Sequence, residues 1–323
     1  MEPNNTSTLP DTADYRNSNT ANFTHYDGNV KLIQVIEFSI ANVGILNNLS
    51  FIFVVCKIRE LQTKTNALLV NLALSDMTWL MNVFCSFFVA IPCTVNALSQ
   101  FTPLIESCLT VAVISVERYI AICHPFKAYV MTSKNMAIAV SITWILSVAL
   151  SSTEVGTCID FLDAEGQDVY AIVCLCLIAA VLFACVILTS SLYALIACAM
   201  QRRKKSSMLT LHKVAFKETK QVLRTVVITN VVIFVSIIPS VVLFFIVVLQ
   251  KDGVYRPTSP RIDTFYVFAQ TAKILYTLNC SINPFIYKLC NSTYRNAVKS
   301  TYCPHFCAPR SGPVHPQVQD TAV

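Results

Sequence analysis

Long apolar segments alternate with short polar ones along most of the chain, and seven of the apolar segments are long enough to cross a membrane. A spanning helix needs about 20 predominantly apolar residues, because the hydrocarbon core offers no partner to free backbone groups. The segments that qualify are residues 31–57, 66–91, 95–122, 135–153, 169–199, 221–249 and 264–289. The pattern predicts an all-α membrane protein, a seven-transmembrane helix bundle.

Polar segments flank this bundle at both ends of the chain. We divide the sequence into an N-terminal tail at 1–30, a transmembrane domain at 31–290 and a C-terminal segment at 291–323. The tail carries no signal peptide, so we expect the first span itself to direct insertion. Residues 291–302 have the pattern of a short amphipathic helix, which we expect to lie along the inner leaflet.

The composition excludes a soluble protein. The chain is 54% hydrophobic and 13% charged, whereas a soluble domain carries roughly 25% charged residues. Most of the 14 cysteines stand inside apolar runs, where cysteine behaves as a small hydrophobe, and none has zinc-site spacing. The net charge of +6 reflects membrane topology rather than nucleic-acid binding.

Basic residues gather on one side of the predicted bundle. No Lys or Arg stands between 152 and 168, after span four, whereas the segment between spans five and six carries Arg202, Arg203, Lys204, Lys205, Lys213, Lys217 and Lys220. Because Lys and Arg accumulate in cytoplasmic loops, we expect the N-terminus outside and the C-terminus inside. We expect glycosylation of the tail at the N-x-S/T sequons of Asn4, Asn5 and Asn22.

A carboxyl group stands in the middle of the second span. Asp76 follows Asn71-Leu72-Ala73, and polar residues at this depth are costly and usually functional. One interpretation is a protonated or hydrogen-bonded carboxyl that serves packing alone, but we favour an ion or proton site. The residues that would add oxygen ligands for a hard cation such as sodium are Asn48, Ser107, Asn279 and Asn283.

The third span carries a polar stripe. At about 100° per residue, Gln100, Ser107 and Arg118 fall within about 20° of one another, so this face must point into the bundle. Glu106 lies about 120° away, and we assign it a structural hydrogen bond rather than a ligand role. Glu37 in span one and Lys273 near the outer end of span seven have the default interpretation of rim residues that snorkel.

Two motifs mark the inner ends of the third and seventh spans, namely Glu117-Arg118-Tyr119 and Asn283-Pro284-Phe285-Ile286-Tyr287. Single polar, aromatic or proline residues accompany them in the other spans: Asn71 and Asp76, Trp144, Tyr193 and Pro239. With these residues the chain from 48 to 294 resembles the rhodopsin-like (class A) G-protein-coupled receptors. Either motif alone is weak evidence, whereas both at the inner ends of the correct spans are specific.

The resemblance implies roles for the motif residues. Glu117 pairs with Arg118 at rest, and its release frees the guanidinium to meet a G protein. Tyr193 and Tyr287 resemble the tyrosines that swing towards that arginine, and Pro239 is the expected hinge of span six because proline removes a backbone hydrogen bond. The position of Phe126 resembles that of the apolar plug that docks onto the G protein.

The resemblance also implies a disulfide. Cys93 stands 25 residues before Arg118, at the family's position for the cysteine that links span three to the second outer loop. Cys158 is the only cysteine in that loop, and the outer compartment is oxidising. The connection between spans two and three is then only a few residues long.

The leading functional hypothesis is a plasma-membrane receptor that converts extracellular ligand binding into activation of a heterotrimeric G protein. A transporter or channel is the alternative, but no two halves repeat and no span carries a ladder of charges. An enzyme is not expected, because no Ser/His pair, HExxH motif or pair of facing acids occurs at one depth.

The ligand stays open at this stage. Gln100 stands where the family's amine receptors carry Asp, and Thr277 stands where opsins place the retinal lysine, so neither ligand class is favoured. Glu37 and Lys273 are candidates for an ion pair across the outer mouth, with two independent rim charges as the alternative. We take Gln100, Glu37 and Lys273 as candidate ligand contacts.

The C-terminal segment carries two further signals. Cys303 and Cys307 closely follow the predicted amphipathic helix, where juxtamembrane cysteines are often palmitoylated; the alternative is two free thiols. The chain ends Asp320-Thr321-Ala322-Val323, which matches the carboxyl terminus that PDZ domains take up. Apart from a sodium ion, we expect no cofactor.

Overall fold

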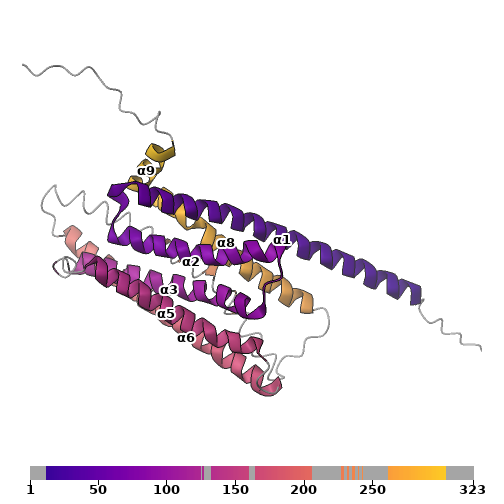
Figure 1. The fold of residues 1–323 in the computed structure, drawn as a ribbon. Helices are drawn as coiled ribbons and strands as arrows, with labels where there is room; N and C mark the ends of the chain where they lie inside the picture. Colours follow the sequence, from indigo (N-terminus) through magenta and orange to yellow (C-terminus); the bar gives the residue numbers. More distant parts are fainter. Residues whose placement is uncertain are drawn as a thin grey trace, which may run out of the picture.

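The computed structural model describes residues 12–124, 126, 132–159, 164–205 and 261–302, together with single positions between 227 and 242 (Figure 1). Every regular element in these ranges is helical. In chain order the elements are α1 (Thr12–Lys57), η1 (Arg59–Leu61), α2 (Lys64–Phe88), α3 (Cys93–Cys123), α5 (Ser133–Val155), η2 (Gly156–Cys158), α6 (Ala164–Lys205), α8 (Arg261–Cys290) and α9 (Ser292–Tyr302).

The helices follow the predicted spans closely. Five helical stretches among the described residues are long and apolar enough to cross a membrane: Lys31–Lys57, Lys64–Phe88, Cys93–Cys123, Ser133–Cys158 and Val169–Arg202. The 30-residue helix α8 covers the seventh predicted span and carries more polar side chains. Within the sixth predicted span, 221–249, the described positions are all helical, and the rest of that span lies outside the described residues.

Helix α1 begins much earlier than the first predicted span. It starts at Thr12 and continues without interruption to Lys57, so part of the polar tail has helical backbone. Pro10 precedes this start, and no other proline follows before Pro92. Since proline is the residue that most strongly interrupts a helix, the membrane span can propagate its helix into the polar segment.

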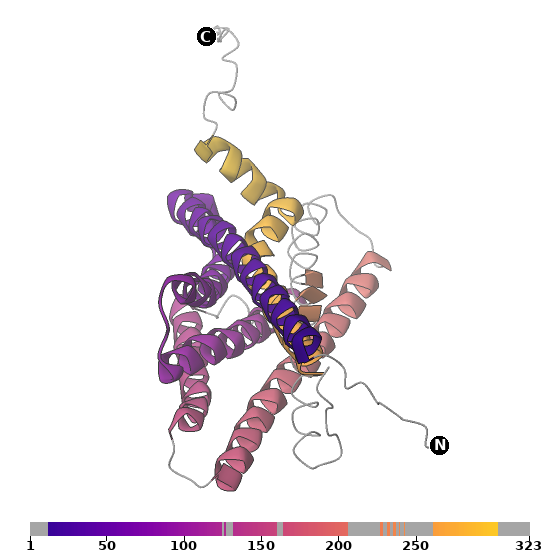
Figure 2. The ribbon, with the colours of Figure 1, turned by 90° about the vertical axis from the view of Figure 1, so that its right-hand side faces the viewer.

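The bundle is arranged around α3. This helix packs against α2, α5 and α6, while α1 packs against α2 and α8. Figure 2 shows α9, drawn in yellow, crossing the end of the bundle at which α1 also ends, and α9 contacts both α8 and α1. The amphipathic helix predicted at 291–302 is therefore present as α9, with Tyr294 and Ala297 buried.

The apolar core lies between the helices, and many large apolar side chains point away from it. One cluster joins α2, α3 and α6, and its members include Leu72, Ile105, Val111 and Leu182. On the outer faces of the bundle Leu46, Ile145 and Ile187 are each about two-thirds exposed. A soluble protein would not leave such a surface in water, but a bilayer solvates it.

Helices α1 and α8 approach closely at Gly44. A Cβ atom added to Gly44 would overlap the side chain of Ser281 and lie 2.9 Å from Leu80 Cδ1. Asn47 donates a hydrogen bond to the carbonyl of Ser281 at 3.0 Å, so the same contact is polar as well as close. A small residue is required here because helix association in membranes depends on close backbone packing.

A disulfide joins Cys93, the first residue of α3, to Cys158 in η2, with their Cα atoms 5.8 Å apart. The pairing expected from the resemblance is therefore confirmed. Only residues 89–92 connect α2 to α3, as that pairing required. The N-terminal end of α3 is thus covalently fixed to the segment that follows α5.

Candidate functional site

Asp76 occupies the centre of the bundle. Its side chain is fully buried on α2, and Oδ2 accepts a hydrogen bond from Asn283 Nδ2 on α8 at 2.7 Å. The side chains of Cys280 and Ser107 also face this carboxyl group. The helical phase that placed Ser107 inside the bundle is confirmed, since Ser107 is buried and its hydroxyl lies 3.1 Å from that of Ser75.

Several buried oxygens around this centre have no hydrogen-bond partner among the described residues. They are Asp76 Oδ1, Asn48 Oδ1, Asn279 Oδ1 and Asn283 Oδ1. The amide nitrogen of Asn48, in contrast, donates to the carbonyls of Gly44 and Cys280 at 2.9 and 3.0 Å. Unpaired buried oxygens are costly, and a set of carboxylate and amide oxygens is the donor chemistry that a hard cation takes.

Near the C-terminal end of α3 Arg118 is held by two neighbours. Its Nε lies 2.5 Å from Glu117 Oε2 and its Nη2 lies 2.6 Å from Glu117 Oε1, which is a bidentate ion pair. Nη2 also donates to Thr65 Oγ1 on α2. The predicted Glu117–Arg118 pair is confirmed, and Thr65 adds a link between α2 and α3 that sequence reasoning missed.

The two tyrosines expected near Arg118 lie in different environments. Tyr193 on α6 accepts a hydrogen bond from Ser115 Oγ on α3 at 2.7 Å. Tyr287 on α8 is buried, its ring centroid lies 4.9 Å from that of Phe51, and its hydroxyl has no hydrogen-bond partner among the described residues. Among the described residues the Tyr287 hydroxyl is thus not hydrogen-bonded to Arg118.

The remaining predicted switch residues have varied exposure. Phe126 is 91% exposed, whereas Pro284 in α8 is buried and Pro239 is half-buried. The ring of Tyr119 lies 5.6 Å from that of His124, edge to face. The side chain of Phe126, three residues after the end of α3, is thus an almost fully exposed apolar group.

Glu106 forms a larger network than the single structural hydrogen bond predicted for it. The carboxylate is fully buried and accepts hydrogen bonds of 2.9–3.0 Å from Asn71, Thr110, Thr143 and Ser147. Trp144 Nε1 in turn donates to Asn71 Oδ1 at 2.9 Å. The network joins α2, α3 and α5, and it satisfies a charge that would otherwise be very costly in the bilayer.

In the N-terminal half of α8, Lys273 Nζ lies 3.1 Å from Glu37 Oε2 on α1. Thr277 Oγ1 donates to Glu37 Oε1 at 3.2 Å and accepts from Trp79 Nε1 on α2 at 3.0 Å. The ion pair considered from the sequence is present. The alternative of a snorkelling rim residue is wrong for Glu37, which is only 3% exposed.

Gln100, the third candidate ligand contact, belongs to a separate group of amides. Its Nε2 donates to Asn96 Oδ1 at 2.8 Å, and Asn82 Nδ2 on α2 donates to the same oxygen at 3.3 Å. All three side chains are buried or half-buried. The structure thus brings Glu37 and Lys273 together and gives Gln100 other partners.

Some predicted modification sites lie outside the described residues. These are Asn4, Asn5, Cys303, Cys307 and the C-terminal residues 320–323. Asn22 lies within α1, but its side chain is not described.

Comparison with known proteins places this arrangement in context. Residues 47–287 match the family described as 7 transmembrane receptor (rhodopsin family). Growth hormone secretagogue receptor type 1 of Mustela putorius furo is 26% identical over 295 residues, covering 79% of this chain and 76% of that receptor. Neuromedin-U receptor 2 of Rattus norvegicus is 25% identical over 315 residues, covering 86% of this chain and 77% of that receptor. Lysophosphatidic acid receptor 4 of Mus musculus is 26% identical over 275 residues, covering 76% of this chain and 70% of that receptor.

Proposed function

This chain belongs to the rhodopsin family of seven-transmembrane receptors and is a multi-pass G-protein-coupled receptor; from that premise we propose its orientation, its switch and its ion site. The family consists of receptors, so the transporter, channel and enzyme alternatives are set aside. We place the protein in the plasma membrane with the N-terminus outside. The support is the positive-inside distribution, with Lys57 at the end of α1, Arg59 and Lys64 after it, and no Lys or Arg between 152 and 168.

The proposed switch is the release of Arg118. One observation carries it: the guanidinium is bound by both oxygens of Glu117 and by Thr65 on α2, which closes the inner ends of α2 and α3 against each other. Charge-assisted hydrogen bonds of this kind are individually strong. Activation would break them and leave the guanidinium, together with the exposed ring of Phe126, available to the G protein.

The experiment is nucleotide exchange on purified heterotrimeric G proteins of several subtypes, catalysed by the receptor reconstituted in lipid nanodiscs. The wild type is expected to accelerate exchange. Arg118→Ala is expected to lower that rate at least about tenfold, because it removes the guanidinium that would contact the G protein after its release, and hydrogen bonds to a charged group contribute roughly 1.5–3 kcal/mol. Arg202→Ala, at an exposed arginine near the end of α6, is the matched control. Exchange by Arg118→Ala at the wild-type rate would refute the proposed switch.

The proposed ion site is a sodium site at Asp76. Its support is the set of buried oxygens without partners on Asp76, Asn48, Asn279 and Asn283, to which the Ser107 hydroxyl is added. When bound, the cation would neutralise the buried carboxylate. The residues of α1, α2, α3 and α8 would thereby be held together in the resting state.

The proposed ligand site is the outer mouth near Glu37, Lys273 and Gln100. The side chain of Lys273 is 31% exposed while its partner Glu37 is buried, so a ligand from outside can reach the ammonium group. The relatives' names indicate different ligands at similar identity, and they do not select one for this chain. Agonist screening with Lys273→Ala and Gln100→Ala tests this assignment, and potency unchanged in both variants would contradict it.

We further propose three features of the tails. Asn4, Asn5 and Asn22 carry glycans, Cys303 and Cys307 are palmitoylated, and Val323 is taken up by a PDZ domain. Replacing Asn4, Asn5 and Asn22 should abolish the change in gel mobility that deglycosylation of the wild type produces. Replacing Cys303 and Cys307 with Ser should abolish labelling of the protein by palmitate. Val323→Asp should abolish capture of the tail peptide by a PDZ panel.

A further inference from the structure

Glu154 is a buried carboxyl group that neither the proposed switch nor the proposed ion site uses. It lies in the last turn of α5, it is only 4% exposed, and its Oε1 has no hydrogen-bond partner among the described residues. No Lys or Arg stands between 152 and 168, and Glu154 forms no ion pair with a residue that the structure describes. A buried charge without a counter-charge is costly, so this group has to be satisfied in another way.

A second buried oxygen without a described partner lies on the helix that follows. Gln167, in the first turn of α6, donates from Nε2 to the carbonyl oxygens of Gly156 at 2.8 Å and Ile159 at 3.2 Å. These bonds fix the amide against η2, directly after Glu154, and they leave Gln167 Oε1 as an acceptor without a partner among the described residues. Two acceptors cannot hydrogen-bond to each other unless one of them carries a proton.

The end of α5 and the first turns of α6 are in close contact around these two groups. Tyr170, about one turn after Gln167, donates to the carbonyl of Thr153 at 2.7 Å. A Cβ atom added to Gly156 would lie 2.5 Å from the Tyr170 hydroxyl, and the charge of Glu154 acts on the same hydroxyl. The carboxyl group therefore faces the first turns of α6. A proton needs no added space in such a contact, whereas a hard metal ion needs several further oxygen ligands.

Few other titratable groups face this contact. Helix α3 carries no charged residue before Glu106. On α6 the described titratable groups are the phenol of Tyr170 and the thiol of Cys174, which donates to the same backbone carbonyl as Tyr170 at 3.8 Å. The side chains of Glu165 and Asp168 are outside the described residues. The contact thus has a single carboxyl group among the residues that the structure describes.

We infer that Glu154 is a proton-binding site, whose protonated carboxyl group donates a hydrogen bond to Gln167 Oε1 and so joins the end of α5 to α6. The proton comes from the outer compartment, because the proposed orientation places this end of the bundle outside. The disulfide between Cys93 and Cys158 extends the connection to α3. Since the folded protein then binds this proton more tightly than the unfolded chain, stability is gained as pH falls and lost as pH rises.

Thermal unfolding of the purified full-length receptor in lipid nanodiscs tests this site without a ligand or a G protein, so its result is independent of the proposed switch. Lowering the pH from about 8 to about 6 should raise the unfolding temperature of the wild type by a few degrees more than that of Glu154→Gln. The amide of the variant donates at every pH, so the variant should be at least as stable as the wild type at the higher pH.

Infrared difference spectra between the two pH values observe the proton directly. The wild type should show the carbonyl band of a protonated carboxylic acid, and Glu154→Gln should lack it. Gln167→Met removes the acceptor and should reduce the gain in unfolding temperature at low pH. A band of equal size in Glu154→Gln would overturn the proton site, and a gain in Gln167→Met equal to that of the wild type would overturn the hydrogen bond to α6.

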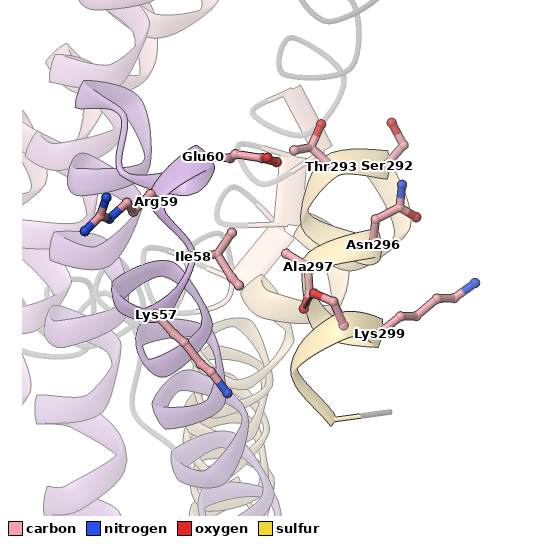
Figure 3. Close-up of a pocket in the computed structure, with 10 residues that line it drawn as sticks. Lys57, Ile58, Arg59, Glu60, Ser292, Thr293, Asn296, Ala297 and Lys299 are labelled. Atoms are coloured by element: carbon pink, nitrogen blue, oxygen red, sulfur yellow. Dashed lines mark hydrogen bonds between the residues drawn. The ribbon is translucent and has the colours of Figure 1, made fainter. Parts of the chain in front are cut away.

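Glu60→Gln is the matched control. This exposed carboxylate lies at the opposite end of the bundle, in the wall of a cavity of about 830 Å³ between the turn after α1 and α9 (Figure 3). Water and the neighbouring Arg59 already solvate its charge, so the variant should keep both the infrared band and the wild-type gain in unfolding temperature. Lower stability of Glu154→Gln than of Glu60→Gln at the higher pH would show that Glu154 acts as a charged group, and would also overturn the inference.

Discussion

Glu106 on α3 accepts a hydrogen bond of 2.9 Å from the amide of Asn71 on α2, at a depth where neither side chain can reach water. Glu106→Ala would remove the carboxylate that accepts from that amide and from the hydroxyls of Thr143 and Ser147. These donors would keep only Thr110 Oγ1 and the backbone carbonyls of Val140 and Thr143 as acceptors. Each such buried loss costs roughly 1–3 kcal/mol, so we expect a lower unfolding temperature and reduced surface expression. Glu60→Ala, at an exposed carboxylate, is the control, and equal unfolding temperatures for the two variants would contradict the prediction.

Thr65→Val should raise basal G-protein activation. The change keeps the shape of the side chain but removes the oxygen that accepts from Arg118 Nη2. Losing a hydrogen bond to a charged group shifts the resting equilibrium by roughly 1.5 kcal/mol or more, or about tenfold. Nucleotide exchange without ligand is the measurement. The control is Thr78→Val, on an exposed face of the same helix, which should have the wild-type exchange rate. If Thr65→Val has the same exchange rate as Thr78→Val, Thr65 does not restrain Arg118.

Sodium should stabilise the wild type but not Asp76→Asn. A neutral amide cannot balance a cation shared with the oxygens of Asn48 and Asn283, and a ligand that binds only the folded state raises stability with its concentration. Thermal unfolding is compared in sodium chloride and in N-methylglucamine chloride of equal ionic strength. A sodium-dependent shift of the same size in both proteins would show that the cation binds elsewhere.

Gly44→Ala should destabilise the contact between α1 and α8. The new methyl group meets Ser281 and Leu80, and overpacking of this kind costs roughly 1–3 kcal/mol. Adding Ser281→Gly should restore part of the loss, since it removes the nearest obstructing atoms. Leu46→Ala on the lipid face serves as a control, and thermal unfolding is the measurement. If the losses of stability caused by Gly44→Ala and Ser281→Gly simply add in the double variant, the two residues are not in contact.

Lys273→Ala should destabilise the receptor more than the double variant Lys273→Ala/Glu37→Gln. The single change leaves the carboxylate of Glu37 buried with hydrogen bonding from Thr277 alone, whereas the double change removes the charge. Because Lys273 is 31% exposed, the pair is only partly buried, and we expect a loss of about 1–3 kcal/mol, below the range for a fully buried pair. Thermal unfolding of the two purified variants decides: a double variant less stable than the single one would mean that the two charges act independently.

The sequence alone was sufficient to predict a structural feature wherever the residues that determine it are close together along the chain or recur at a regular spacing. Apolar runs located the described spans to within a few residues, and Glu117 and Arg118 are neighbours whose pairing needs no knowledge of other helices. Helical phase also placed Ser107 inside the bundle. These predictions depend on the geometry of a single helix.

Contacts between helices were harder to predict. Helical phase gives the face of α3 on which Glu106 lies, but it does not show which side chains of α2 and α5 lie at the same height in the bundle. The hydrogen-bond donors Asn71, Thr143 and Ser147 were therefore not predicted. The contact of Thr65 with Arg118 was missed for the same reason, although its place in the first turn of α2 puts it at the correct end. The relative height of two helices is set by packing along their whole length.

The bonds between α2, α3 and α5 limit how this receptor can move. Besides the Glu106 network, Ser75 donates to the carbonyl of Pro103 at 2.9 Å, and the hydroxyls of Thr102 and Ser151 lie 2.5 Å apart. Sliding or rotating α3 would break these bonds where no water can replace them, and the disulfide at Cys93 would resist it as well. These bonds therefore oppose sliding or rotation of α3 against α2 and α5 in the part of the bundle between Ser75 and Ser151.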